Sequence, residues 1–328
     1  MSRARPAFSV RGLTKRYEQT VAIEDVTFSV DTGTSVGLVG PSGAGKSTVL
    51  RILLGLVRPT AGTASVGSPG AAAGIGGGSP VGGMLAPRGL HPARAARDHL
   101  SIHAAAARVP DGRVEEVLDS VGLSGHADTR ISALSAGQHT RLALATALLA
   151  DPPLLILDEP AEGLDASERG WLQDFLRGHN RRGGTVLLSS TSLAAVVPMV
   201  DNLVVMSEGS VVYQGSPAKL RRGHPDRLVV AASTPVALAT VLAARGYTDA
   251  VIRPDGRLAV ADATESQIRD AAHTAGVRLD SVTADPIHPD RVLASLTKPR
   301  TTAPTPFAAP APYPNHPVQQ PTSYGIPR

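Results

Sequence analysis

The stretch that decides the fold is Gly40-Pro41-Ser42-Gly43-Ala44-Gly45-Lys46-Ser47-Thr48. An apolar run precedes it and a helix-forming run follows it, so the order is strand, glycine-rich loop and helix. Glycines let such a loop curl until several backbone N–H groups hold phosphate oxygens, and the helix presents its positive end to the same anion. Lys46 then reaches the β- and γ-phosphates and Ser47 ligates Mg²⁺. An ordinary glycine-bearing turn is the alternative, but the complete motif predicts a nucleoside triphosphate site.

Composition restricts the class of protein. A chain of 328 residues fits about two domains of ~150 residues each, and a hydrophobic content of 42% supports a buried core. The chain has no cysteine, which excludes disulfides and cysteine-ligated zinc and fits a reducing compartment. We find no signal peptide and no apolar run near the ~18 residues of a membrane span. We therefore expect a cytoplasmic protein that meets the membrane only through a partner.

The positive charge of the chain is concentrated in its C-terminal tail. The net charge is +4, and residues 298–328 contribute Lys298, Arg300 and Arg328 without any acid. The folded part is therefore close to neutral, and we expect no nucleic-acid partner. The tail is rich in proline, which predicts a disordered, partly polyproline II segment.

Two acids follow a buried strand further along the chain. Residues 154–157 form a continuous apolar run of the type found in parallel sheets, and Asp158 and Glu159 come directly after it. An acid at that end of a strand, beside a phosphate loop, can hold Mg²⁺, and a neighbouring carboxylate can deprotonate the attacking water. We expect Asp158 to ligate the metal with Ser47, and Glu159 to act in catalysis with Lys46.

The order of elements predicts an α/β fold. Strands with near-continuous apolar runs alternate with helices, which indicates a parallel sheet covered on both faces. A helical insertion is expected at about residues 90–135, after a segment at residues 67–83 whose glycine, alanine and serine content is typical of a linker. The predicted strands are residues 36–39, 81–85, 154–157, 185–190 and 200–206, followed by a short last strand at residues 210–213.

Together, these motifs resemble the nucleotide-binding subunit of ABC transporters over about residues 6–220. Leu134-Ser135-Ala136-Gly137-Gln138 is similar to the family signature, and Gly163-Leu164-Asp165 is similar to the D-loop. Alone, Ser135 would be a helix N-cap and Tyr17 a strand-edge tyrosine. In the light of the resemblance, Ser135 belongs to the signature and Tyr17 matches the aromatic residue that stacks on adenine.

The resemblance implies a phosphate-loop NTPase domain at residues 1–222 and a composite site. In this family, two subunits pair head to tail around two ATP molecules, so that Ser135, Ala136, Gly137 and Gln138 of one subunit complete the site of the other. It also implies Mg²⁺, a second copy of the chain, and a separate permease at the inner face of the cell membrane. The form of the ATP-binding domain and the presence of a C-terminal appendage favour export over import.

The sequence departs from the family at three positions. Ala86 stands where a glutamine is usual, and alanine neither binds Mg²⁺ nor positions water. Thr191 stands at the position of the switch histidine, and a hydroxyl cannot act as an imidazole does. Ala136 replaces a signature glycine, which is a milder change. We expect ATP binding, with hydrolysis that is slow or depends on a partner.

The remaining chain suggests a second domain at residues 223–297. Its β-α-β-β-α-β order predicts a small α+β, ferredoxin-like sandwich, and it contains no catalytic constellation. Residues 298–328 form the predicted tail.

Three functions stay open from the sequence. The first is an ATPase subunit that powers a permease, and the second is a regulatory protein that uses ATP as a dimer clamp and hydrolyses it poorly. The third is an ABC protein of translation or DNA repair, which would need tandem cassettes or a long coiled-coil insertion, and neither is present in this sequence. The transported substrate is not encoded in these motifs.

Overall fold

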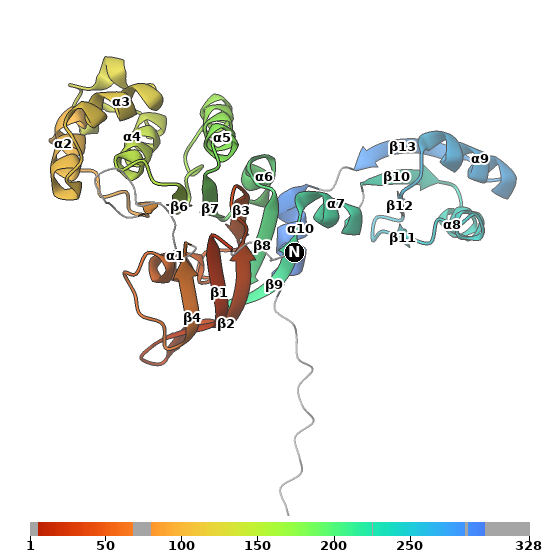
Figure 1. Cartoon of the computed structure of the whole chain (residues 1–328). Coiled ribbons are helices and arrows are strands. Elements are labelled where there is room, and N and C mark those ends of the chain that lie inside the picture. Colours follow the sequence, from red (N-terminus) through yellow and green to blue (C-terminus); the bar gives the residue numbers. More distant parts are fainter. Residues whose placement is uncertain (1–5, 68–79, 225, 286–287, 299–328) are drawn as a thin grey trace, which may run out of the picture. The chain divides into compact units, whose positions relative to one another are not determined.

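A computed structural model describes residues 6–67, 80–224, 226–285 and 288–298 (Figure 1). Most of the predicted linker at residues 67–83 and nearly all of the predicted tail at residues 298–328 lie outside these ranges. Within the described ranges, no helix has the length and apolar character needed to cross a membrane.

The centre of the fold is a six-stranded sheet. Its strand order is β5-β6-β7-β3-β8-β9. The first five strands pair in parallel, which confirms the predicted parallel sheet, and β9 adds an antiparallel edge. In chain order the strands are β3 (Ser35–Val39), β5 (Val81–Met84), β6 (Leu154–Leu157), β7 (Thr185–Ser190), β8 (Asn202–Ser207) and β9 (Ser210–Gly215).

Each apolar strand of this sheet contributes side chains to two hydrophobic cores, because successive side chains point to opposite faces of the sheet. In β6, Leu155 and Leu157 join the helix-side core, which also takes residues from α4 (Ala136–Leu148), α5 (Ala166–Arg181) and α6 (Leu193–Val196). Leu154 and Ile156 join the opposite core, which includes residues of α1 (Lys46–Leu53). Both faces are therefore covered, as an uninterrupted apolar run requires.

The N-terminal strands form a second, antiparallel sheet that the sequence did not predict as a unit. Its order is β2-β1-β4, with β1 (Phe8–Tyr17), β2 (Thr20–Val30) and β4 (Ala61–Val66). Strand β1 extends to Tyr17, because its pairing with β2 continues to a hairpin at Tyr17 and Thr20. Buried apolar residues of β1 and β2 pack in the core that contains α1.

The predicted helical insertion lies between β5 and α4. It contains α2 (Ala96–Ala107) and α3 (Gly112–Ser120), followed by the short 3₁₀ turns η2 (Ser124–His126) and η3 (Ile131–Ala133). Figure 1 shows α2, α3 and α4 gathered into one helical group. Apolar residues of α2 and α3 join the helix-side core, so the insertion packs as part of the same domain.

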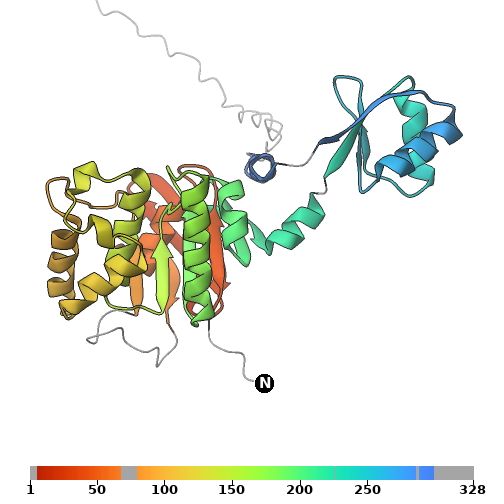
Figure 2. The same ribbon diagram turned by 90° about the horizontal axis from the view of Figure 1, so that it is seen from above.

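After α7 (Pro217–Gly223) the chain forms a separate four-stranded antiparallel sheet with the order β11-β12-β10-β13. Its two helices share one core on one side of the strands, as Figure 2 shows. This matches the predicted β-α-β-β-α-β order. The elements are β10 (Arg227–Ala232), α8 (Pro235–Ala244), β11 (Ala250–Ile252), β12 (Leu258–Ala261), α9 (Glu265–Ala275) and β13 (Leu279–Asp285).

The last described helix, α10 (Pro289–Leu296), packs against α6 and β8. Its Val292 and Leu293 belong to the helix-side core, beside residues of α6 and of η4 (Val197–Met199). The sequence groups this helix with the C-terminal domain at residues 223–297. The boundaries at residues 222 and 297 stay predictions.

Candidate functional site

The conformation of the phosphate loop requires glycine at several positions. Gly43 and Gly45 have φ angles of 82° and 94°, in the left-handed region that glycine tolerates. A Cβ on Gly40 would overlap the carbonyl oxygen of Met206, and one on Gly45 would overlap the Ile23 side chain. The loop is also tied to the sheet, because the Gly40 N–H donates to the Ser190 carbonyl at 3.1 Å. The glycines therefore let the loop curl tightly against the strand ends.

Lys46 begins α1 and points back into this loop. Its ammonium donates to the carbonyls of Gly40 at 2.7 Å and Pro41 at 3.1 Å, and it lies 3.6 Å from Glu159 Oε1. The Lys46 side chain is only 6% exposed, and burial lowers its pKa while the charges of Glu159 and Asp158 oppose that shift. The cleft above it has a volume of about 420 Å³ and is lined by Thr20, Val21, Ala22, Ser42, Gly43, Ala44, Gly45, Lys46, Ser47, Thr48, Glu159, Glu162 and Thr191.

The two predicted metal ligands meet at the floor of the site. Asp158 Oδ1 accepts hydrogen bonds from the Ser47 hydroxyl at 3.2 Å and from the Ser189 hydroxyl at 2.5 Å. Asp158 Oδ2 is buried and has no hydrogen-bond partner in the described structure. A buried carboxylate oxygen needs a partner, and carboxylate and hydroxyl oxygens are hard donors suited to Mg²⁺. The donor set therefore fits a magnesium ion.

Glu159 lies next to Asp158 with its carboxylate directed into the cleft. Its Oε2 accepts the backbone N–H of Thr191 at 3.1 Å, and its own N–H donates to the Ser189 hydroxyl at 2.9 Å. Burial raises the pKa of Glu159, opposed by the Thr191 hydrogen bond and the charge of Lys46. A raised pKa makes this carboxylate a stronger base toward water.

Sequence reasoning missed Ser189. The Ser189 hydroxyl donates to Asp158 and accepts from the Glu159 backbone, so it links the two acids. The sequence did show a polar residue near the C-terminal end of the apolar strand at residues 185–190. The structure shows that this residue is fully buried. Thr191, the predicted switch residue, contacts Glu159 through its backbone.

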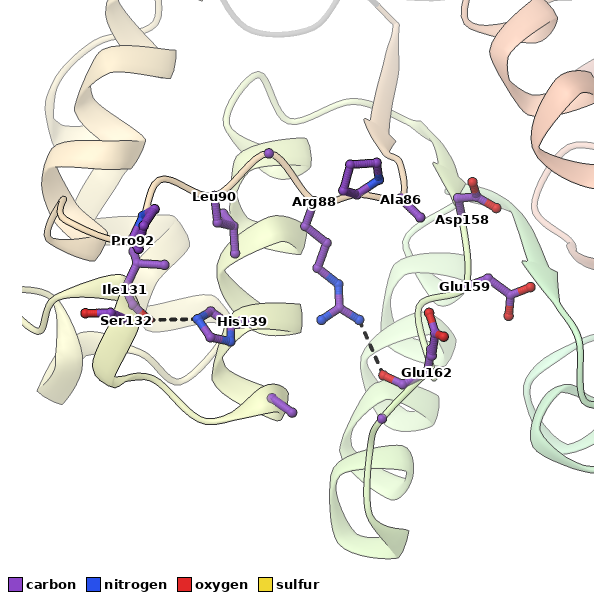
Figure 3. A pocket seen from close by; sticks show the side chains of 14 residues that line it. Ala86, Arg88, Leu90, Pro92, Ile131, Ser132, His139, Asp158, Glu159 and Glu162 are labelled. Carbon is purple, nitrogen blue, oxygen red and sulfur yellow. Dashed lines mark hydrogen bonds between the residues drawn. The ribbon is translucent and has the colours of Figure 1, made fainter.

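A second cavity of about 700 Å³ adjoins Asp158 and Glu159 (Figure 3). Ala86 lines it but offers only a methyl group there, while Arg88 extends into the space and donates to the Glu162 carbonyl at 3.4 Å. Burial lowers the pKa of Arg88. The facing wall comes from the helical insertion and α4, and includes Ile131, Ser132, Ala136 and His139.

The signature residues begin α4 on the far side of this cavity. Ser135 is the N-cap, and a reciprocal pair of bonds joins it to Gln138: the Gln138 N–H donates to the Ser135 hydroxyl and the Ser135 N–H to the Gln138 side chain. Ser135 and Ala136 are exposed, and Gly137 is buried. The described residues that line the phosphate-loop cleft include none of these four, so the chain does not bring its own signature to its own loop.

The D-loop residue and the predicted adenine-stacking residue lie apart from the acids. Asp165 is the N-cap of α5 and forms a reciprocal pair with Glu168. Tyr17 is 44% exposed at the β1–β2 hairpin, with the Lys15 ammonium 4.8 Å from its ring centroid. Tyr17 does not line the cleft, although residues 20–22 of the same hairpin do.

Comparison with known proteins places this geometry in a family. A family model described as ABC transporter matches residues 23–162. The chain is 34% identical over 233 residues to the Nod factor export ATP-binding protein I of Bradyrhizobium diazoefficiens, covering 68% of this chain and 75% of that protein. The chain belongs to the ABC transporter family of ATP-binding proteins.

Two further comparisons agree with this membership. The sulfate/thiosulfate import ATP-binding protein CysA 2 of Chromobacterium violaceum is 35% identical over 225 residues, covering 67% of this chain and 62% of that protein. A solved structure described as an ATP binding subunit of an ABC transporter is similar in fold, with a TM-score of 0.56 and 27% identity over 66% of this chain and 92% of that one. The predicted ABC-type fold and ATPase class are thereby confirmed.

Proposed function

We propose that this protein is the ATP-hydrolysing subunit of a transporter, supplying energy to a separate membrane permease. One observation carries the proposal: the phosphate loop, Lys46, the Ser47–Asp158 pair and Glu159 converge at the carboxyl ends of neighbouring parallel strands. In open α/β sheets, ligands bind at that edge.

The residues of this site have three roles in phosphoryl transfer: binding the phosphates, holding the metal and accepting a proton from water. Loop N–H groups and the Lys46 ammonium hold the β- and γ-phosphates. Ser47 and Asp158 would hold Mg²⁺, which would neutralise charge on the phosphates. Glu159 orients a water molecule and takes its proton as the water oxygen bonds to the γ-phosphorus. The bond to the β–γ bridging oxygen breaks, and ADP leaves with its electron pair.

The signature lies outside the cleft of its own chain, which supports a head-to-tail dimer of two copies. In this arrangement Ser135, Ala136, Gly137 and Gln138 of one subunit close over the γ-phosphate held by the other. The exposed start of α4 offers backbone N–H groups to that anion. ATP is then a ligand with higher affinity for the closed pair, and hydrolysis reopens it.

A groove next to the second cavity is a suitable contact for the permease. Its volume is about 400 Å³, and it is lined mainly by apolar residues that include Leu54, Leu56, Leu85 and Met84. Leu56 is 64% exposed, and Pro87 and Arg88 line both this groove and the cavity beside Glu159. A cytoplasmic segment of a permease in this groove would touch the same loop that borders the hydrolytic site.

The permease would place this subunit at the inner face of the cell membrane. The names of the relatives include both export and import proteins, and the C-terminal four-stranded segment leads us to favour export.

A second function is favoured by Ala86 and Thr191. Neither side chain can replace the glutamine and histidine of the family, and an ATP-clamped protein that hydrolyses poorly would have the same cleft. We therefore expect slow turnover of the purified chain. A turnover rate typical of the family that Thr191→Ala leaves unaffected would contradict this expectation.

Replacing Glu159 by glutamine tests the proposed catalytic role. We expect Glu159→Gln to lower ATP turnover about 100-fold or more, because the base is lost, while ATP affinity is preserved. Turnover is measured by phosphate release and affinity by titration with a fluorescent ATP analogue. Glu265→Gln is the matched control, since Glu265 is an exposed glutamate of α9 that lines neither cavity, and its turnover should stay near wild type. Normal hydrolysis by Glu159→Gln would show that the base is another group.

A further inference from the structure

Helix α6 begins directly after the switch position, and a side chain from α10 holds its first turn. Asp290 Oδ1 accepts the backbone N–H of Leu193 at 2.7 Å and of Ala194 at 3.1 Å. Both oxygens of this carboxylate also accept the Ser192 hydroxyl at 3.2 Å. Asp290 thus satisfies two N–H groups at a helix start, from a position 97 residues further along the chain than Leu193.

Helix α6 is short, and within the chain segment it has the Ser192 N-cap and the buried Leu193 and Val196 to stabilise it. It spans only Leu193–Val196, and a helix of one turn gains too few internal hydrogen bonds to be stable alone. Its position therefore depends on packing and on its caps. Helix α10 is itself fixed, because Val292 and Leu293 are buried in the helix-side core and the Thr297 carbonyl accepts the Ser207 hydroxyl at 3.2 Å.

The segment from residue 190 to residue 194 connects Asp290 to the hydrolytic site. At one end, the Ser190 carbonyl accepts the Gly40 N–H of the phosphate loop. In the middle, the Thr191 N–H donates to Glu159 Oε2 at 3.1 Å. At the other end, the Ser192 hydroxyl and the next two N–H groups bind Asp290. A shift of the α6 start would therefore move the N–H that orients Glu159.

We propose that Asp290 is a positioning residue for ATP hydrolysis. By fixing the start of α6, it holds the Thr191 N–H against the carboxylate of Glu159, so that Glu159 keeps the orientation needed to accept a proton from water. This role rests on the proposed function of Glu159 as the base. It requires no contact between Asp290 and ATP, so substrate binding is unaffected.

Three substitutions in the full chain test this role. Asp290→Ala removes the carboxylate, and we expect kcat for ATP to fall about tenfold while KM changes less than twofold, because a small misplacement of a catalytic group slows chemistry and not binding. Asp290→Asn keeps an oxygen that accepts the same N–H bonds, so kcat should stay within about threefold of wild type. Arg291→Ala is the matched control, because Arg291 lies on the same helix with a side chain that is 73% exposed.

Hydrogen–deuterium exchange of peptides covering residues 190–197 gives a second readout that is independent of hydrolysis. We expect faster exchange in Asp290→Ala and wild-type exchange in Asp290→Asn and Arg291→Ala. Unchanged kcat or unchanged exchange in Asp290→Ala would overturn the proposal, as would an equal loss of kcat in the asparagine variant. If Asp290→Ala does not fold, Asp290→Glu, which displaces the carboxylate by one carbon, is read in the same way. A wild-type chain without turnover would refute the hydrolytic function. The exchange measurement would then still show whether Asp290 fixes the start of α6.

Discussion

At the level of single residues, the two acids of the site differ. Among the described residues, none forms a hydrogen bond to the buried Oδ2 of Asp158, which favours a cation there. Both oxygens of Glu159, in contrast, have a described partner, because Oε1 lies near Lys46 and Oε2 accepts the Thr191 N–H. Ser189 ties the two acids together. One acid is thus suited to a metal and the other to a proton.

The raised pKa of Glu159 predicts the pH dependence of hydrolysis. Only the ionised carboxylate accepts a proton, so kcat/KM, which reports the groups of the free enzyme, should fall as pH decreases through the pKa of Glu159. Because burial raises that pKa above the ordinary glutamate value of 4.5, the acid limb should lie above pH 4.5. The charged groups that act on Glu159 are Lys46, Asp158 and Glu162. Steady-state rates between about pH 4 and 8 measure this limb, and a midpoint at or below 4.5 would contradict the prediction.

His99 predicts a separate pH dependence, of stability. Its ring is 2% exposed in α2, and burial, with the neighbouring charges of His103 and Arg94, lowers its pKa from 6.5 to about 4. Between these values the unfolded chain binds a proton that the folded chain does not. The contribution is therefore complete above pH 6.5 and is lost as pH falls toward 4, by up to about 3 kcal/mol.

Urea unfolding at pH 7 and pH 5 tests the role of His99. In His99→Leu the free energy of unfolding should decrease less between these two pH values than in wild type. The exposed neighbour His103 provides the control, since His103→Ala should retain most of the decrease. An equal decrease in His99→Leu and wild type would assign the pH dependence to other groups.

At the scale of elements, the starts of α4 and α5 fit against each other. A Cβ on Gly137 would overlap the carboxylate of Glu168, the residue that also accepts the Asp165 N–H at the N-cap of α5. The glycine of the signature and the acid of the D-loop are therefore linked through one glutamate. This gives Gly137 a structural role within its own chain, in addition to the proposed contact with ATP in the other subunit.

A double-mutant cycle tests this contact. We expect Gly137→Ala to lower the free energy of unfolding by about 1 kcal/mol, because Glu168 must leave its capping position. In a Glu168→Ala background the same substitution should have a smaller effect, since the overlapping group is gone. Urea unfolding of the four chains provides the values. Equal effects of Gly137→Ala in both backgrounds would show that Glu168 is not the cause.

Local motifs made much of this architecture predictable. The loop at residues 40–48 and the run ending at Asp158 and Glu159 carry their structure in consecutive residues, so the parallel sheet and its acids follow from the sequence. In the antiparallel sheet β2-β1-β4, the pairing of β1 with β4 joins residues more than forty positions apart in the sequence, as in Ser9 with Ser65. No local pattern encodes such pairing. The roles of Ser189 and Asp290 could not be predicted for the same reason, because their hydrogen-bond partners come from distant parts of the chain.

At the scale of the whole molecule, the proposed composite site predicts complementation between two inactive chains. Lys46→Ala removes the ammonium that binds phosphate in the loop. Ser135→Arg places a large side chain on the signature, where it would prevent close approach to ATP. Each variant alone should therefore hydrolyse ATP poorly. A mixed dimer contains one site with both parts intact. If mixing is random, half of the dimers are mixed and half of their sites work, so about a quarter of wild-type turnover should return.

The matched control for complementation uses the same surfaces. Lys46→Ala mixed with the double variant Lys46→Ala, Ser135→Arg has no intact loop in any dimer and should stay inactive. Phosphate release before and after mixing measures the recovery. A mixture no more active than its separate components would argue against a site shared between two copies.

The course of the chain around the four-stranded segment has an evolutionary consequence. Leu220 and His224, just before that segment, and Pro289 and Val292, just after it, line the same small cavity of about 70 Å³. The chain therefore departs and returns at nearly one point, in the manner of a domain inserted into a host. Such an insertion can be gained, lost or exchanged by recombination without rebuilding the ATP site, provided that the replacement returns the chain to α10.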